Sequence, residues 1–130
     1  MILFDTDICV ELLRGNKKII QRRSEYSGEV GISFMTVAEL YYGAENAQNT
    51  AESKVLVDKF LLTVDVVWPD IAILKRFGEI KSELRRRKTP LPDADLFIGA
   101  ASLEKCEALI TGHTKHFEKI PGLKIENWIR

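Results

Sequence analysis

Met1-Ile-Leu-Phe4-Asp5-Thr6-Asp7 is the stretch that decides the fold, because an unbroken apolar run ends there on two acids one residue apart. A short, continuously apolar run is typical of a strand buried on both faces of a sheet. Asp5 ends this strand, and Thr6 or Asp7 can cap the helix that follows. The chain therefore begins with a buried strand whose carboxyl end carries acidic side chains.

The rest of the chain alternates between strand and helix patterns. Further strands are expected at residues 30–33, 64–67, 108–111 and 123–128. Helical patterns lie between them; one opens at Thr36, where Glu39 three residues on makes a capping box, and continues through residues 44–62. A further helix is expected after the cap Asp70. Short apolar strands separated by helices predict one α/β domain over residues 1–130, with a central, mostly parallel sheet of about five strands covered on both faces.

Composition excludes several classes of protein. The 130 residues contain 19 basic and 19 acidic side chains, so no overall field draws the chain to nucleic acid or membrane, and such binding must come from local patches. The only cysteines, Cys9 and Cys106, lie in apolar helical patterns and are expected to be reduced core thiols. No run approaches the length of a membrane span, and no secretory signal is recognisable. We therefore expect a soluble, cytoplasmic protein.

A second acidic stretch, Pro90-Leu-Pro-Asp93-Ala-Asp95-Leu-Phe-Ile-Gly-Ala-Ala101, opens another helix. Asp93 is the better candidate for its cap, and Asp95 falls in the first turn. Ligand sites in parallel sheets lie beyond the carboxyl ends of the strands. Asp5 ends the first strand, Glu39 begins the helix after the second, and Asp95 begins the helix before the fourth. We therefore expect Asp5 and Glu39 to converge with Asp93 or Asp95 on one patch.

Converging carboxylates repel one another unless a cation lies between them. Ligation by oxygen alone suits Mg²⁺ or Mn²⁺, whereas Zn²⁺ is not expected, since no cluster of histidine or cysteine has ligand spacing. Such a cation polarises a phosphoryl oxygen and lowers the pKa of water. Ordinary roles stay open: Glu39 could serve only the capping box, Asp93 only the cap, and Asp7 either the helix start or a further acid beside the metal.

Basic side chains could line a path for a polyanion. They are Arg85, Arg86, Arg87 and Lys88 in one cluster, with Arg14 and Lys115 elsewhere in the chain. The ordinary alternative for the cluster is a solvated helix end, where cations are favoured by the helix dipole.

Taken together, the motifs resemble PIN-domain ribonucleases of the VapC type, the toxins of toxin–antitoxin pairs. The resemblance covers nearly the whole chain and rests on residues 3–15, 36–44, 93–101, 109–111 and 117–128. It implies a PIN-like three-layer α/β/α fold and an endoribonuclease that uses Mg²⁺, with Mn²⁺ as a substitute, to activate water. It also implies a small antitoxin of the VapB type as partner, RNA as substrate, and a homodimer.

The resemblance assigns the metal to Asp5, Glu39 and Asp95, with Asp93 as an auxiliary acid, and places Thr6, Asp7, Thr111 and His113 around them. The chain departs from the family pattern at two positions. Asp7 stands where asparagine is common, and His113 stands where the family usually has asparagine or aspartate. His113 could bind Mn²⁺, bind phosphate when protonated, or be silent.

Two other functions compete with this interpretation. Asp5-Thr6-Asp7 also resembles the opening of haloacid-dehalogenase phosphatases, with Asp5 as nucleophile and Asp7 as acid and base. A catalytically degenerate PIN scaffold that only binds RNA or a partner is the non-enzymatic alternative, and His113 is the residue that favours it.

Overall fold

A parallel sheet of five strands forms the centre of the molecule in a computed structural model that describes residues 1–130. The strand order is β3-β2-β1-β4-β5, and every pair of neighbours is parallel. The strands are β1 (Ile2–Phe4), β2 (Val30–Ser33), β3 (Asp65–Val67), β4 (Ala108–Ile110) and β5 (Ile125–Glu126). The predicted α/β class and all five predicted strands are confirmed, although β5 is much shorter than the expected 123–128.

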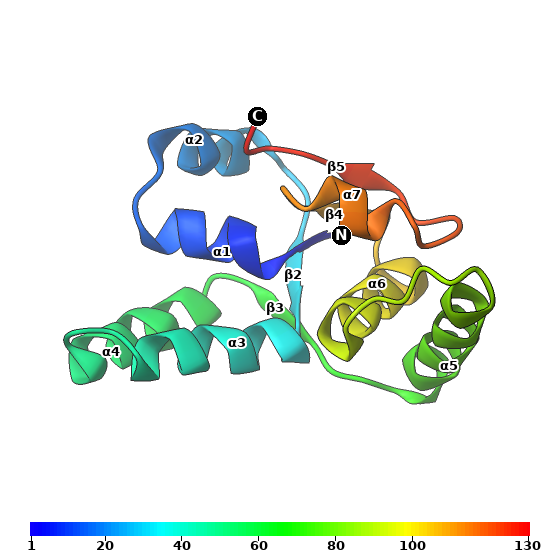
Figure 1. The fold of residues 1–130 in the computed structure, drawn as a ribbon. Helices are drawn as coiled ribbons and strands as arrows, with labels where there is room; N and C mark the ends of the chain where they lie inside the picture. Colours follow the sequence, from blue (N-terminus) through cyan, green and yellow to red (C-terminus); the bar gives the residue numbers. More distant parts are fainter.

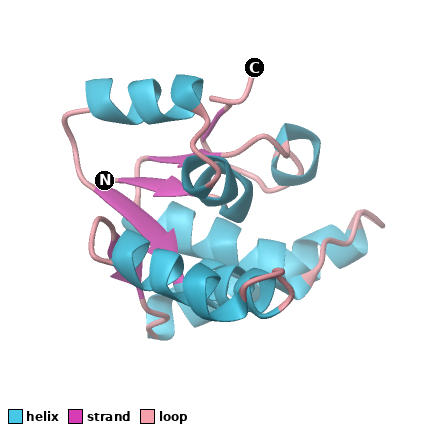
Figure 2. Ribbon diagram, turned by 90° about the vertical axis from the view of Figure 1, so that its left-hand side faces the viewer, coloured by secondary structure: helices cyan, strands magenta, loops and turns pink.

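Helices cover both faces of this sheet (Figures 1 and 2). They are α1 (Thr6–Leu13), α2 (Lys17–Glu25), α3 (Phe34–Glu45), α4 (Thr50–Leu61), α5 (Ile71–Arg86), α6 (Asp93–Lys105) and α7 (Thr114–Phe117). Side chains of α1 to α4 build one core cluster, and those of α5 to α7 build the other. The three-layer arrangement is therefore helices, sheet, helices. No helix has both the length and the apolar character that a membrane crossing requires.

Strand β1 shows why the sheet separates two cores. Ile2 and Phe4 point into the cluster under α1 to α4, while Leu3 between them points into the cluster under α5 and α6. All three side chains are buried. Successive side chains of a strand face opposite sides, so an unbroken apolar run is what a strand needs when helices cover both faces.

The strand register sets the position of the site. Phe4 pairs with Ile32 on one side and with Ile110 on the other. The next residues along these strands are Asp5, Ser33 and Thr111, so three polar side chains stand at the same edge of the sheet.

Several helix starts differ from the sequence prediction. The cap of α1 is Asp5, whose carboxylate accepts from the Thr6 N–H, and not Thr6 or Asp7. The cap of α3 is Ser33, because the helix begins directly where β2 ends; Thr36 is then a buried residue of the first turn. The predicted capping box is therefore wrong. The predicted cap at Asp70 is confirmed, since its carboxylate accepts from the Ile73 N–H at 3.0 Å.

Two helical segments were also mispredicted. The helical pattern through residues 44–62 is broken, because α3 ends at Glu45 and Asn49 caps a new helix by accepting from the Glu52 N–H at 3.1 Å. The single turn α7 was not expected at all. Its four residues are too few to show a helical repeat of apolar positions.

Candidate functional site

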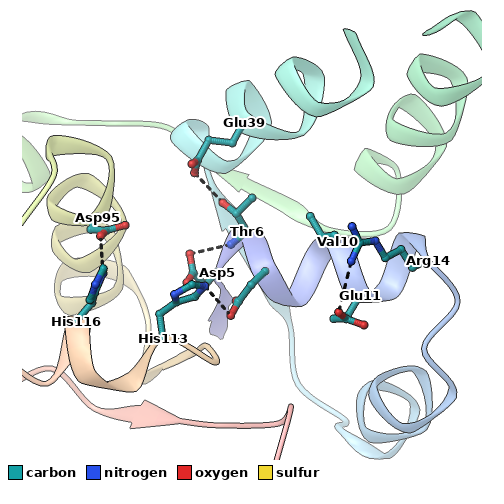
Figure 3. Close-up of a pocket in the computed structure, with 10 residues that line it drawn as sticks. Asp5, Thr6, Val10, Glu11, Arg14, Glu39, Asp95, His113 and His116 are labelled. Carbon is teal, nitrogen blue, oxygen red and sulfur yellow. Dashed lines mark hydrogen bonds and ion pairs between the residues drawn. The ribbon is translucent and has the colours of Figure 1, made fainter. Parts of the chain in front are cut away.

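A pocket of about 430 Å³ opens at the carboxyl ends of the strands (Figure 3). Its lining is almost entirely polar and consists of Asp5, Thr6, Asp7, Val10, Glu11, Arg14, Glu39, Asp95, His113 and His116. The three carboxylates predicted to converge on the sheet edge all line this pocket. They come from separate elements: Asp5 follows β1, Glu39 lies on α3 and Asp95 lies on α6.

Asp5 is the most deeply placed of these acids, with 5% of its surface exposed. Its Oδ1 accepts from the Thr6 N–H at 2.8 Å, and its Oδ2 accepts from the Thr111 hydroxyl at 2.7 Å. Burial raises the pKa of Asp5 from its ordinary value of 3.8 to about 6; the Thr111 bond lowers it in part, and the charge of Asp7 raises it further. A buried carboxylate held above its normal pKa is a site that a cation would stabilise.

This pKa predicts how the stability of the metal-free protein depends on pH. Asp5 binds its proton more tightly in the folded than in the unfolded chain, so the free energy of unfolding should fall as pH rises from about 4 to about 6. A shift of this size corresponds to a loss on the order of 2–3 kcal/mol. Asp5→Asn should remove this component. Urea unfolding in EDTA at pH 4.5 and 7.5 measures it, and identical pH dependence of parent and variant would contradict the proposed burial cost.

Glu39 is held by a short chain of hydroxyl groups. Thr6 Oγ1 donates to Glu39 Oε1 at 2.8 Å, and it lies 3.0 Å from Thr36 Oγ1. Because the Thr6 hydroxyl has one proton, which goes to Glu39, Thr36 must donate in turn to Thr6. Thr36 therefore supports the site through Thr6. The sequence prediction had made it a helix cap and did not include it in the site.

Asp95 occupies the first turn of α6, where the helix dipole favours a negative charge. Its Oδ2 lies 3.3 Å from His116 Nδ1 on α7. His116 also lines the pocket, and the sequence prediction missed it. The only signal in the sequence was a second histidine three residues after His113.

Asp7 and His113 form the remaining side of the pocket. Asp7 Oδ2 accepts from the Gly112 N–H at 2.8 Å and lies 3.4 Å from His113 Nε2. Asp7 Oδ1 is buried without a hydrogen-bond partner. Asp7 and His113 are the two positions at which the chain departs from the family pattern, and their side chains contact each other.

Asp93 does not join the other acids. Its side chain is 58% exposed and pairs with Lys81 of α5 at 2.9 Å. It is the first residue of α6 rather than its cap, a position that Pro92 occupies without any side-chain hydrogen bond. Two expectations are therefore corrected: Asp93 caps no helix, and the structure places it outside the pocket, because Lys81 holds it on the α5 side.

The predicted basic path is divided between different surfaces. Arg14 lines the pocket with a side chain that is 73% exposed. Lys115 is exposed on α7 but is not part of the lining. The cluster formed by Arg85, Arg86, Arg87 and Lys88 lies at the end of α5, where Arg86 and Arg87 pair with Glu83, and none of the four lines the pocket.

The pocket's donor atoms suit a hard divalent cation. The acids offer oxygen ligands, and one oxygen of Asp7 has no other partner. No three side chains of histidine, cysteine, aspartate or glutamate lie close enough together to hold a metal ion between them. Mg²⁺ usually keeps several waters and uses only one or two carboxylates, so an open group of acids fits Mg²⁺ or Mn²⁺ better than it fits a fully protein-ligated ion.

Comparison with known proteins identifies relatives over nearly the full length. Residues 2–123 match the PIN domain family. A tRNA(fMet)-specific endonuclease VapC of Shigella flexneri is 29% identical over 127 residues, which cover 97% of this chain and 96% of the relative. Ribonuclease VapC1 of Haemophilus influenzae strain R2866 is 29% identical over 131 residues, with 98% of each chain covered.

Solved structures of similar proteins share the fold. DNA-bound VapBC from Salmonella typhimurium superposes with a TM-score of 0.92 at 28% identity, covering 98% of this chain and 97% of the other. VapBC-1 from nontypeable Haemophilus influenzae gives 0.90 at 30% identity and covers all of both chains. Fold and sequence agree, and this chain belongs to the PIN domain family, among its VapC-type members.

Proposed function

We propose that this chain is a divalent-metal-dependent endoribonuclease and the toxin of a type II toxin–antitoxin pair. The observation that carries the proposal is the meeting of Asp5, Glu39 and Asp95 at one pocket of a PIN fold. The names of the relatives support it, since they are ribonucleases and a tRNA-specific endonuclease. The proposal includes a cytoplasmic location, because that is where such an RNA substrate is available.

Each acid has a defined task in this proposal. When bound, Mg²⁺ or Mn²⁺ supplies a Lewis acid for the phosphodiester and lowers the pKa of the attacking water. Asp5 anchors the site because two hydrogen bonds fix its carboxylate. Glu39 and Asp95 face it across the pocket, and the exposed Arg14 at the rim holds a phosphate of the RNA backbone.

The proposal extends to a small antitoxin as protein partner. The related structures are complexes titled VapBC, and that from Salmonella typhimurium is bound to DNA. A VapB-type antitoxin would block the pocket of this chain. Co-expression with the neighbouring reading frame should yield a stable complex without ribonuclease activity, and an active complex would contradict neutralisation by this partner.

The test of the proposed activity is RNA digestion with controlled metal. We expect the protein to cut a panel of single-stranded RNAs and transfer RNAs with Mn²⁺ or Mg²⁺, and to leave them intact in EDTA. It should not hydrolyse p-nitrophenyl phosphate, which the Asp-x-Asp phosphatase alternative requires. Intact RNA under all metal conditions would favour the degenerate scaffold, and hydrolysis of the phosphomonoester would favour the phosphatase.

A homodimer is also expected, and exposed apolar side chains offer a surface for it. Trp68, Ile71 and Leu74 are 68%, 67% and 45% exposed and follow one another from the end of edge strand β3 into α5. Large apolar side chains left exposed to water on neighbouring elements are candidates for an interface. Light scattering should give the mass of two chains for the parent and of one chain for Leu74→Glu. Leu62→Glu, at the equally apolar but separate end of α4, should stay dimeric.

A further inference from the structure

We propose that His116 is a positioning residue, whose imidazole holds the Asp95 carboxylate turned into the pocket. The inference rests on the proposed function and deepens it. It begins from a difference among the acids of the pocket. Asp5 accepts hydrogen bonds from Thr6 and Thr111, whereas His116 is the only hydrogen-bond partner of the Asp95 carboxylate. The side chain of Asp95 is also 22% exposed, so its carboxylate reaches the pocket with no other hydrogen bond to fix its direction.

The two residues sit on segments whose relative position is fixed by packing. Phe117, next to His116, is buried in the same core cluster as Leu96, next to Asp95. One turn further along α6, Gly99 faces Ile120 so closely that a Cβ on Gly99 would lie 2.5 Å from Ile120 Cδ1. Asp95 and Gly99 are four residues apart and share one face of α6, which lies along the segment from α7 to β5. The contact between Asp95 and His116 therefore continues a packed interface.

A histidine suits this task better than a lysine. In the tautomer that carries its proton on Nδ1, a neutral imidazole donates a hydrogen bond to Asp95 and leaves the carboxylate its full negative charge for a cation. The pair formed by Lys81 and Asp93, outside the pocket, shows the opposite arrangement, in which a permanent positive charge neutralises the acid. The two aspartates at the start of α6 thus have different partners, a permanently charged lysine outside the pocket and an imidazole inside it.

The single turn α7 brings His116 to the pocket. The His116 and Phe117 N–H groups both bond back to the carbonyl of His113, at 3.2 and 3.3 Å. This turn buries Phe117 and leaves His116 exposed toward the pocket (Figure 3). Burial of Phe117 in the core thus fixes the position of its neighbour His116.

The test compares two substitutions that differ only in their ability to donate. His116→Phe keeps a planar ring and removes the donor, whereas His116→Asn places an amide N–H near the position of Nδ1. With Mn²⁺ binding followed by calorimetry in the absence of RNA, we expect His116→Phe to weaken the metal about 10-fold or more, the size typical for groups that orient ligands. His116→Asn should stay close to the parent. Lys119→Gln, exposed three residues further on, is the matched control and should not change the affinity.

A double substitution separates positioning from a general structural role. If His116 acts through the Asp95 carboxylate, His116→Phe should not weaken Mn²⁺ binding further in an Asp95→Asn background, which keeps one side-chain oxygen at this position. The melting temperature in EDTA should be the same for parent and His116→Phe. The inference is overturned if His116→Phe binds Mn²⁺ as the parent does, or if His116→Asn loses as much as His116→Phe. A parent that binds no Mn²⁺ would overturn the proposed function itself, and this inference with it.

Discussion

Asp95→Asn and Asp5→Asn should each reduce RNA cleavage by about 10²–10³-fold, the loss typical when one electrostatic group that stabilises a transition state is removed. Asparagine keeps the size and one oxygen of aspartate but removes the negative charge. At position 5 that oxygen can still accept from the Thr6 N–H, so the start of α1 is preserved. The loss should therefore appear in kcat while the circular dichroism spectrum remains that of the parent.

The matched control for this prediction lies two residues from Asp95. Asp93→Asn changes charge in the same way on the same helix turn, but Asp93 points to Lys81 outside the pocket. We expect its cleavage rate to stay within about twofold of the parent, since surface substitutions away from a site have small effects. Equal losses from Asp93→Asn and Asp95→Asn would mean that the pocket residues are wrongly chosen. Full activity of Asp5→Asn would mean that the acids do not perform the chemistry.

Mn²⁺ should raise the melting temperature of the parent by about 10 °C when its concentration is about 100 times the dissociation constant. A ligand that binds only the folded state contributes about 2.7 kcal/mol under these conditions, and each kcal/mol moves the melting temperature of a domain of this size by several degrees. The increase should be larger at pH 7.5 than at pH 5, because the buried Asp5, with a pKa of about 6, must lose its proton to bind a cation.

Asp95→Ala should abolish this increase, because it removes a carboxylate from the pocket and leaves the fold intact. Differential scanning fluorimetry with Mn²⁺, Mg²⁺ and, as a control for ionic strength, K⁺ provides the measurement. A parent melting curve that does not respond to Mn²⁺ would count against a metal site, whatever the cleavage assay shows.

The sequence predicted the parts of the site that depend on strand ends. Asp5 follows a buried strand and Glu39 belongs to the helix after the next strand, so the rule for parallel sheets brings them to one edge. Asp95 was placed there because it begins the helix before β4, although that helix follows α5 rather than a strand. Local patterns alone do not decide between neighbouring acids. Asp93 was predicted to cap α6 and to act as an auxiliary acid. Its carboxylate instead pairs with Lys81 of α5, a contact that the local sequence does not reveal.

Side chains positioned by distant segments were the ones missed. His116 lies on a turn of four residues, too short for periodicity, and its contact with Asp95 spans 21 positions in the chain. Thr36 looked like a cap because Glu39 follows it at the right spacing. Ser33 takes that role, since β2 runs into α3 without a loop, and Thr36 is left to support Glu39 through Thr6.

The central position of β1 has a consequence for how such a protein is made. The first strand of the chain pairs with β4, and the hydroxyl that fixes Asp5 comes from Thr111, 106 residues later. A ribosome has therefore passed Thr111 before the pocket can close around Asp5. Contacts so far apart in sequence also form slowly. The pocket around Asp5 is thus complete only when the segment that carries Thr111 has joined the first strand.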